Sequence, residues 1–546
     1  MFENLRRWLS AHPKSTLVLM VLAALTPFLS KPFNIDDPLF IWAAHQIQIH
    51  PGNPYGFNVE WGWTQFPMWK VTENPPFTCY FIALTAAILG WGEVALHSFF
   101  LLPAVLVILG THRLARHFCR QPLLAAIVTL FTPVFLVSST TVMCDVPMLA
   151  FWIWAIVLWV EGLAQDGLRK LALAGLLIAL AEMTKYYAAC LVPLLAAYSL
   201  ANRRPLSRWA QFLLIPLTVL CAYQYVTQAA YGTSLLYYAM EYAARSKSVF
   251  GFSKWDNGLI ALAFAGGCLA PVVIFAPWQW RQRALGLFGG GAAAVAAGVF
   301  FNEELWKYYK GIQGSAQVPL KIQMIILAIG GLCALALALA DLRSRRDARS
   351  LLLALWVAGT FVFAGFCNWT VNARSILPMA PAVAILIIRR LEQNKSARPS
   401  AVKFCLAVSA AFALLLTWSD VSHARAVRQS ANLVHDKYCR TTGTLWFQGH
   451  WGFQFYMQEF GALPVDFKHP ELKTGELVAI PAVNTNLRPP DPRYSTLLDI
   501  LMVPGPAWLT TWNPDVGAGF YASLRGPLPF AFGRVPPEIV SVYILK

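Results

Sequence analysis

Residues Leu320–Ala340 read LKIQMIILAIGGLCALALALA, an apolar run in which Lys321 is the only charged side chain. A helix needs about 20 predominantly apolar residues to cross the hydrocarbon core of a bilayer, so this run is long enough to span a membrane. Twelve more apolar runs lie near residues 16–30, 95–112, 122–138, 147–163, 170–183, 187–201, 209–228, 258–277, 285–301, 350–367, 376–390 and 402–418. The sequence therefore predicts an all-α polytopic membrane domain with about 13 transmembrane helices.

Composition supports the same class of protein. Of the 546 residues, 57% are hydrophobic and only 13% are charged, whereas soluble domains carry about 25% charged residues. These values exclude a disordered chain and an ordinary soluble enzyme. The net charge of +16 has two interpretations, basic cytoplasmic loops or a nucleic-acid surface. The first is favoured, and no nucleic-acid partner is expected.

Basic residues also predict the topology. We expect a retained first helix with its N-terminus in the cytoplasm. Alternation then places 21 Lys and Arg residues in cytoplasmic loops up to residue 398 and nine in the opposite loops, although those loops are longer. This asymmetry agrees with the positive-inside rule. The first outer loop, residues 31–94, is large, and its apolar segment 75–91 is predicted to lie at the membrane interface.

The composition changes after Trp418. Residues 444–447, 477–480 and 539–544 resemble short strands, and residues 452–460 resemble a helix. The predicted organisation is a transmembrane catalytic domain over residues 1–420, followed by a small α/β extramembrane domain over residues 421–546 on the outer face.

Three outer-side carboxylates are candidate catalytic residues: Asp36, Asp37 and Asp145. A helix-start interpretation competes for two of them, because Asp accepts hydrogen bonds at an N-cap and Pro fits the first helical turn. Pro38 follows Asp37 directly, and Pro147 follows Asp145 closely. Asp36 has no such explanation, and it lies beside a second carboxylate that disfavours its ionisation.

Outer-side cations are few, and four are candidates for binding a phosphate: Lys185, Arg374, Arg245 and Lys70. Arginine suits phosphate geometrically. The alternative for Lys185 is a side chain that snorkels to the interface. The segment Trp61–Trp69 holds three tryptophans, which either stack on sugars or form part of an interfacial belt.

These motifs, taken in order, resemble the GT-C superfamily of integral membrane glycosyltransferases, in particular the branch of protein O-mannosyltransferases and lipid A aminoarabinose transferases. The resemblance rests on Asp36-Asp37 after the first span, Asn74-Pro75-Pro76-Phe77, Asp145-Val146-Pro147, Thr184-Lys185, and Arg374 with Leu377-Pro378 and Pro381. Asp37 stands where that branch carries Glu.

The resemblance implies an inverting glycosyltransferase that moves a sugar from a polyprenyl-phosphate donor to an acceptor at the outer face. The acceptor is left open among lipid A, another glycolipid or glycan, and a protein hydroxyl. Asp36 falls on the position of the proposed catalytic base. The implied location is a bacterial inner membrane with the C-terminal domain in the periplasm. Some relatives hold a divalent metal near the first loop, where Glu73 is available. No ligand cluster is visible in the sequence, so no metal site is assigned, and a divalent metal stays open as a cofactor.

Two other classes stay open. A transporter or flippase of lipid-linked sugars usually carries ionisable residues within its spans and repeat symmetry, whereas these spans are almost free of charge. A membrane scaffold with an outer binding domain has no need of Asp36. Within the enzyme class, a polymerase or ligase shares the topology but uses a lipid-diphosphate donor.

Overall fold

The computed structural model describes residues 12–72, 74–250, 252–280, 282–309, 317–394, 398–440 and 443–546. The described chain is mostly helical. Within it, six helices are long and apolar enough to cross a membrane: α6 (Glu93–Ala115), α9 (Asp145–Ala164), α12 (Leu206–Tyr231), α19 (Gln317–Arg345), α20 with the π-helical turn η4 (Ala348–Cys367), and α23 (Pro399–Tyr438). The count of 13 spans stays a prediction.

The remaining apolar runs form shorter helices, several of them broken. Pro133 and Pro271 each begin a new helix inside a run that the sequence suggested was continuous, because proline lacks the N–H of a helix interior but fits the first turn. The shorter helices are α2 (Pro13–Leu25), α7 (Pro122–Leu130), α8 (Pro133–Ser138), α10 (Leu168–Thr184), α11 (Leu191–Ala201), α14 (Lys254–Cys268), α15 (Pro271–Ile274), α16 (Ala276–Gln279), α17 (Gln282–Phe300) and α22 (Met379–Gln393).

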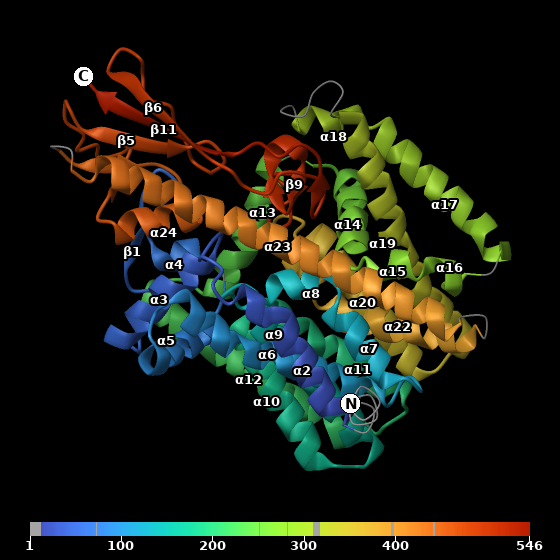
Figure 1. Ribbon diagram of the computed structural model, residues 1–546. Coiled ribbons are helices and arrows are strands. Elements are labelled where there is room, and N and C mark those ends of the chain that lie inside the picture. The colour runs from blue at the N-terminus through green and yellow to red at the C-terminus, as the bar shows by residue number, and fades with distance from the viewer. Residues whose placement is uncertain are drawn as a thin grey trace, which may run out of the picture.

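Helix α23 connects the helical part of the molecule to the C-terminal strands (Figure 1). It runs without a break for 40 residues, which corresponds to about 60 Å at 1.5 Å per residue. The predicted domain boundary at residue 420 therefore lies inside one helix.

Helices α14 and α19 pack closely because of a glycine. A Cβ added to Gly266 of α14 would lie 1.8 Å from the carbonyl oxygen of Leu327 in α19, so only glycine allows this approach.

The C-terminal strands form a five-stranded sheet in the order β4-β3-β5-β11-β6. Strands β3 (Leu445–Phe447), β4 (Leu463–Pro464) and β5 (Leu477–Pro481) pair in parallel, whereas β11 (Glu538–Leu545) pairs antiparallel with β5 and with β6 (Ser495–Val503). Helix α24 (Trp451–Glu459) follows β3. The predictions of strands near 444–447, 477–480 and 539–544 and of a helix over 452–460 are confirmed.

Residues 505–534, here called the return segment, leave this sheet between β6 and β11 and pack against the helices. Leu509, Trp512, Phe520, Tyr521 and Phe530 belong to the same buried apolar cluster as the transmembrane helices. The segment contains the short strands β7 (Leu509–Thr510), β8 (Trp512–Asn513), β9 (Ala518–Gly519) and β10 (Ala531–Phe532). The C-terminal part is thus divided between its own sheet and the helical core. The prediction of a separate domain did not anticipate that residues 505–534 pack against the helices.

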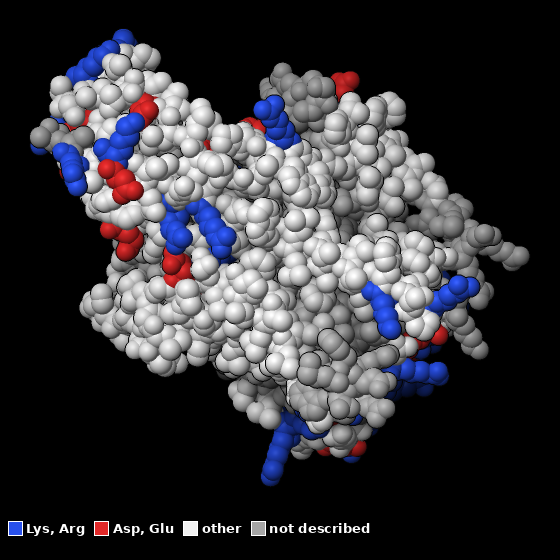
Figure 2. All heavy atoms as spheres, viewed as in Figure 1, with Lys and Arg blue, Asp and Glu red and all other residues white. Residues whose placement is uncertain are grey.

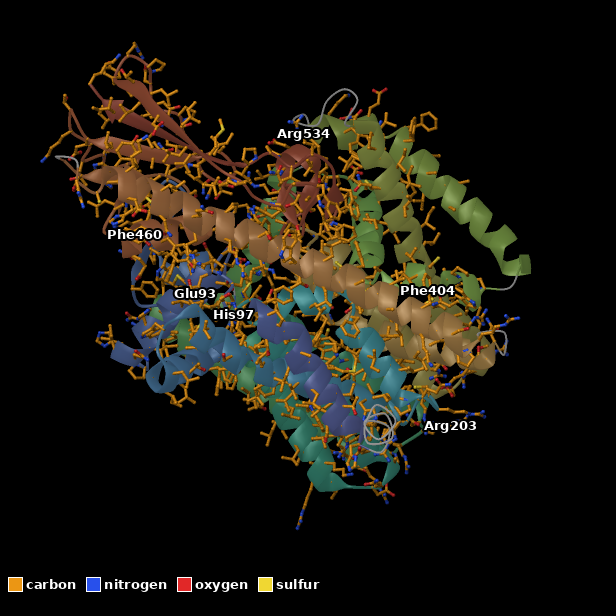
Figure 3. The ribbon with its side chains drawn as sticks, viewed as in Figure 1. Glu93, His97, Arg203, Phe404, Phe460 and Arg534 are labelled. Carbon is orange, nitrogen blue, oxygen red and sulfur yellow. The ribbon has the colours of Figure 1, made fainter. Side chains whose placement is uncertain are left out.

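Charged side chains gather at two ends of the visible face. Figure 2 shows them over the C-terminal strands and at the opposite end, with a broad uncharged surface between. Arg203, from a loop predicted to be cytoplasmic, lies at the end away from Phe460 and Glu93 (Figure 3). Glu93, at the start of α6, accepts hydrogen bonds from Arg428 at 2.8 Å and from the Tyr456 hydroxyl at 3.0 Å. This contact fixes α23 and α24 to the first outer loop.

Candidate functional site

A cavity of about 1150 Å³ lies where the first outer loop, the helices and the return segment meet. Its lining includes Asp36 from the loop that precedes α3 (Asp37–Ile49), Lys185 after α10, and Arg374 in the short helix α21 (Ala373–Ile376). Tyr521 and Arg525 of the return segment line it as well. Three residues predicted from separate motifs are therefore brought to one cavity.

Asp36 and Arg374 form an ion pair in this lining. The Arg374 Nη2 donates to Asp36 Oδ2 at 2.8 Å, and the side chains of Arg374 and Asp36 are 15% and 25% exposed. Asp36 occupies the N-cap position of α3, yet its side chain makes no capping hydrogen bond. Its carboxylate is thus committed to Arg374 and remains accessible from the cavity.

Backbone strain concentrates around the same cavity. Six described non-glycine residues have positive φ, and three of them, Ile35, Trp451 and Asn486, line the cavity with φ values of 51°, 64° and 56°. A positive φ is unfavourable for a β-branched residue such as Ile35, which directly precedes Asp36. Residues held in sparsely populated conformations cluster at functional sites, which agrees with the choice of this cavity as the candidate site.

Asp145 and Lys185 form a second ion pair beside the first. Lys185 Nζ lies 2.6 Å from Asp145 Oδ1, and Asp145 is 1% exposed. The helix-start interpretation of Asp145 holds for its place, because α9 begins at Asp145 with Pro147 in its first turn. Cys144 occupies the N-cap position, however, and no side chain makes a capping hydrogen bond. Burial lowers the pKa of Arg374, but the nearby charges of Asp36 and Asp145 outweigh it and raise that pKa above its usual range. Arg374 therefore joins the two pairs electrostatically.

Asp37 serves the loop rather than the cavity. Its side chain is fully buried, does not line the cavity, and accepts hydrogen bonds from the backbone N–H groups of Asn34 at 3.0 Å and Val142 at 2.8 Å. Helix α3 begins at Asp37 with Pro38 in its first turn, as the helix-start interpretation expects, although no side chain makes an N-cap hydrogen bond. Desolvation raises the pKa of Asp37 to about 6 against the opposing effect of Lys31. The structure places Asp37 as the link between the first outer loop and the turn before α9.

Two of the predicted phosphate-binding cations lie outside the cavity lining. Arg245 pairs with Glu241 on the surface, and Lys70 lies over the ring of Trp69. Residues 235–250 form the helix α13 (Leu235–Phe250) rather than the expected loop. The helical repeat brings Lys247, not Arg245, to the cavity with its neighbours on the same face.

Sequence reasoning missed the contribution of the return segment. Arg525 lines the cavity, donates to the carbonyl oxygen of Asn484 at 2.8 Å and lies 5.6 Å from the ring centre of Trp451. Nothing in the sequence around Arg525 indicates a path back to the membrane; the aromatic stretch from Trp508 to Phe532 was the available signal. Four cations and one carboxylate line the cavity within the described part of the chain: Lys185, Lys247, Arg374, Arg525 and Asp36.

A buried network holds the return segment against the first loop. Lys31 Nζ lies 2.5 Å from Asp420 Oδ2, and both side chains are 2% exposed. The Asp420 carboxylate also accepts from the hydroxyls of Thr511 at 2.6 Å and Tyr521 at 3.1 Å. The Tyr521 ring lies 5.7 Å below the Arg374 guanidinium. The network thus runs from α23 to the Asp36–Arg374 pair.

The tryptophan-rich segment forms a hairpin beside the cavity. Strands β1 (Asn58–Trp61) and β2 (Thr64–Pro67) pair antiparallel. Trp61 lines the cavity and stacks on His450 with ring centres 4.6 Å apart, whereas Trp63 is exposed. Close packing completes the wall: a Cβ on Gly452 would lie 2.5 Å from the carbonyl oxygen of Phe33.

Neither Asp36 of the cavity lining nor the adjacent Asp145 belongs to a group of potential metal ligands among the described residues. Asp36 and Asp145 are each held by a cation, and no group of three His, Cys, Asp or Glu side chains converges among the described residues. Glu73, the residue available for a metal in the first loop, lies outside the described residues. No chemical step is therefore assigned to a metal.

Comparison with known proteins finds a family match over part of the chain. Residues 73–226 match the family described as dolichyl-phosphate-mannose-protein mannosyltransferase. No curated protein matches the sequence significantly. The matched region contains Asp145 and Lys185 but not Asp36 or Arg374.

The solved structures that match the chain have low sequence identity to it. The oligosaccharyltransferase of Archaeoglobus fulgidus is 13% identical, with a TM-score of 0.48, over 84% of this chain and 65% of that chain. ArnT from Cupriavidus metallidurans, solved with undecaprenyl phosphate, is 14% identical, with a TM-score of 0.43, over 86% and 93%. The arabinofuranosyltransferase AftD from Mycobacteria is 13% identical, with a TM-score of 0.41, over 99% and 40%. By its family match, residues 73–226 of the chain resemble the dolichyl-phosphate-mannose-protein mannosyltransferases.

Proposed function

We propose that this protein transfers a sugar from a polyprenyl-phosphate donor to an acceptor at the outer face of a membrane, with inversion at the anomeric carbon. The observation that carries the proposal is one accessible carboxylate, Asp36, in a cavity whose other charged lining residues, among those that the structure describes, are all cations. A base and a phosphate-binding surface are the two elements that such a transfer requires.

Asp36 is the proposed general base. An acceptor oxygen placed at its carboxylate attacks the anomeric carbon from the side opposite the phosphate, and the C–O bond to the phosphate breaks. The acceptor proton passes to Asp36 as the new glycosidic bond forms. A single displacement of this kind inverts the configuration. Arg374 keeps the carboxylate oriented toward the cavity.

The leaving polyprenyl phosphate is proposed to be stabilised by Lys185 and Arg374, with Lys247 and Arg525 at the edges of the same cavity. Cations fixed in a largely buried site stabilise developing negative charge more strongly than mobile ions in water. Lys185 is held in place by Asp145, and Arg374 by Asp36 and the ring of Tyr521. Asp37 is proposed to position Asp36 rather than to react.

The acceptor stays at the level of a class: lipid A, another glycolipid or glycan, or a protein hydroxyl. The proposed location is a multi-pass position in a bacterial inner membrane, with residues 421–546 in the periplasm. Trp61, which lines the cavity, is a candidate for stacking on the sugar.

The test uses the full-length protein in lipid nanodiscs with a radiolabelled panel of polyprenyl-phosphate sugars, compared with Asp36→Asn. Asp166→Asn is the matched control, because Asp166 is exposed and pairs with Arg204 and Arg208 outside the cavity. We expect transfer or donor hydrolysis in the wild type and the control, and its loss in Asp36→Asn with donor binding and thermal melting retained. Full activity in Asp36→Asn contradicts its role as base. In proteoliposomes, donor movement across the bilayer without cleavage contradicts the transferase and supports a flippase.

A further inference from the structure

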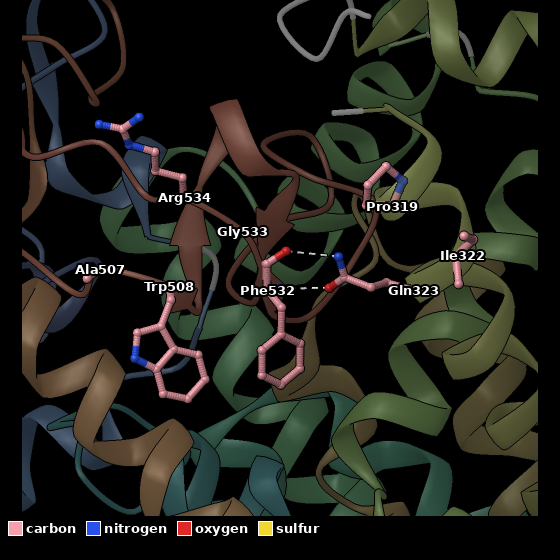
Figure 4. Close-up of a pocket in the computed structure, with 8 residues that line it drawn as sticks. All are labelled: Pro319, Ile322, Gln323, Ala507, Trp508, Phe532, Gly533 and Arg534. Carbon is pink, nitrogen blue, oxygen red and sulfur yellow. Dashed lines mark hydrogen bonds between the residues drawn. The ribbon is translucent and has the colours of Figure 1, made fainter. Parts of the chain in front are cut away.

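A second hollow lies on the outside of the molecule, away from the catalytic cavity. It is an open groove of about 780 Å³ between the first turns of α19 and the return segment (Figure 4). Ile322 and Gln323 come from α19, whereas Trp508, Phe532 and Arg534 come from the return segment. None of these residues lines the cavity that contains Asp36.

Gln323 fixes the geometry of the groove. Its side-chain amide donates to the carbonyl oxygen of Phe532 at 2.9 Å and accepts from the Phe532 N–H at 2.8 Å, as the dashed lines in Figure 4 mark. The amide thereby pairs with β10 as a neighbouring strand would. With the backbone held, the rings of Phe532 and Trp508 stack with centres 6.0 Å apart. The groove is therefore a built surface with a defined shape.

The apolar side chains of the groove remain uncovered. Ile322 and Trp508 are each 50% exposed, and Phe532 is 41% exposed. Val318 and Ile326 lie one turn before and one turn after Ile322 on α19 and are 49% and 52% exposed. Residues spaced by four share one face of a helix. The groove thus continues into an apolar stripe along a helix long enough to cross a membrane.

The groove has an apolar end and a charged end. In Figure 4 the rings of Trp508 and Phe532 point one way, whereas the side chain of Arg534 points the opposite way. Among the residues that the structure describes, Arg534 is the only charged one in the lining. Tryptophan is enriched at membrane–water interfaces, and arginine extends from such positions toward the headgroups. The arrangement matches a lipid, with an apolar chain at one end and an anionic group at the other.

We propose that this groove binds one anionic lipid of the surrounding bilayer, with an acyl chain along Ile322 and the rings of Trp508 and Phe532, and its headgroup at Arg534. The occupant reaches the groove from the bilayer because the apolar stripe of α19 faces outward. A bound lipid would join α19 to the return segment, which also carries Tyr521 and Arg525. The inference does not depend on the proposed transferase activity.

The first test measures lipid retention by native mass spectrometry of the full-length protein in detergent, with phosphatidylglycerol and phosphatidylcholine added in equal amounts. We expect preferential retention of one phosphatidylglycerol. The variant Arg534→Gln is expected to reduce that preference about fivefold, the effect of one Arg near an anionic headgroup. Arg440→Gln, at another exposed arginine of the C-terminal part, is the matched control and is expected to leave the preference unchanged.

The second test locates the lipid. Phosphatidylglycerol with brominated acyl chains quenches nearby tryptophan fluorescence, and the quenched component is expected to disappear in Trp508→Phe. Equal retention of the two lipids, or an unchanged preference in Arg534→Gln, overturns the proposal. Identical quenching in Trp508→Phe and the wild type places the lipid elsewhere and also overturns it. A doubled mass without bound lipid assigns the groove to a second copy of the chain instead.

Discussion

The guanidinium of Arg374 lies 2.8 Å from the carboxylate of Asp36, although 338 positions separate the two residues in the chain. The charge of Asp145 also stabilises the protonated form of Arg374. Asp145 itself is paired with Lys185, whose Nζ lies 2.6 Å from its carboxylate. Two carboxylates and two cations therefore form one continuous electrostatic unit at the wall of the cavity. Within it, Asp36 keeps the greater exposure, so the unit has a fixed interior and one accessible carboxylate.

The geometry of Arg374 is expected to matter beyond its charge. Arg374→Lys preserves the charge but not the planar fork that holds Asp36 while facing the cavity. We expect kcat to fall roughly 10- to 100-fold, in line with the roughly 1.5–3 kcal/mol of a hydrogen bond to a charged group. Steady-state kinetics with saturating donor measure this effect. Arg345→Lys, at an arginine paired with Asp341, should leave kcat unchanged, and equal losses in both variants would contradict a specific role.

Asp37 is expected to make stability depend on pH. Its pKa is about 6 in the folded protein against an ordinary value of 3.8, so the folded state holds a proton that the unfolded state releases between about pH 4 and pH 6. The contribution of Asp37 to stability is therefore largest below that range and is lost as the pH rises through it. Asp37→Asn abolishes this titration.

The measurement is the difference in melting temperature between the wild type and Asp37→Asn, taken at several pH values from 4 to 6.5. Using the difference cancels titrations shared by both proteins, such as that of Glu538, whose pKa burial raises to about 8. We expect the advantage of the wild type to shrink as the pH rises. A difference that is constant with pH contradicts the assignment.

A double-mutant cycle at Asp145 and Lys185 can separate the effect of this ion pair on stability from its effect on activity. Lys185→Met leaves a carboxylate that is 1% exposed without its closest partner, which is expected to cost about 3 kcal/mol or more of stability. Adding Asp145→Asn removes the buried charge and should restore most of the melting temperature. Activity should stay low in the double variant because the cation for the phosphate is still missing. Recovery of activity together with stability would show that the pair has only a structural role.

Local sequence signals predicted the helices well because hydrophobicity alone specifies them. Each apolar run is helical, and the chain leaves α10 at Thr184, as the Thr184-Lys185 motif indicates. Proline explains the breaks at Pro133 and Pro271. Helix α13 was missed because its face toward the cavity mixes aromatic, small and charged residues.

The sequence could not predict which distant residues pair with one another. Asp36, Lys185 and Arg374 were each singled out as scarce charges on the outer side, but which carboxylate meets which cation depends on tertiary packing. The buried pair of Lys31 and Asp420 was missed for the same reason. A single sequence carries no information on the path of the return segment, so Tyr521 and Arg525 were not candidates.

Arg525 offers a test of whether the C-terminal part shares in binding the donor. Its guanidinium lines the cavity, and it pairs with a backbone carbonyl rather than a carboxylate, so its charge remains available to an anion. Arg525→Gln keeps a hydrogen-bond donor but removes the charge. We expect donor affinity to fall roughly tenfold, equivalent to about 1.4 kcal/mol. We expect a smaller reduction of kcat, because the contacts of Arg525 are to Asn484 and Trp451 and not to Asp36 or Arg374. Binding of a polyprenyl phosphate without sugar, monitored by tryptophan fluorescence, separates this effect from catalysis.

The control for this measurement is Arg493→Gln, at an exposed arginine paired with Asp491 in the same C-terminal part. An unchanged donor affinity in Arg525→Gln would limit the return segment to a structural role, whereas a loss confined to Arg525→Gln makes it part of the binding site.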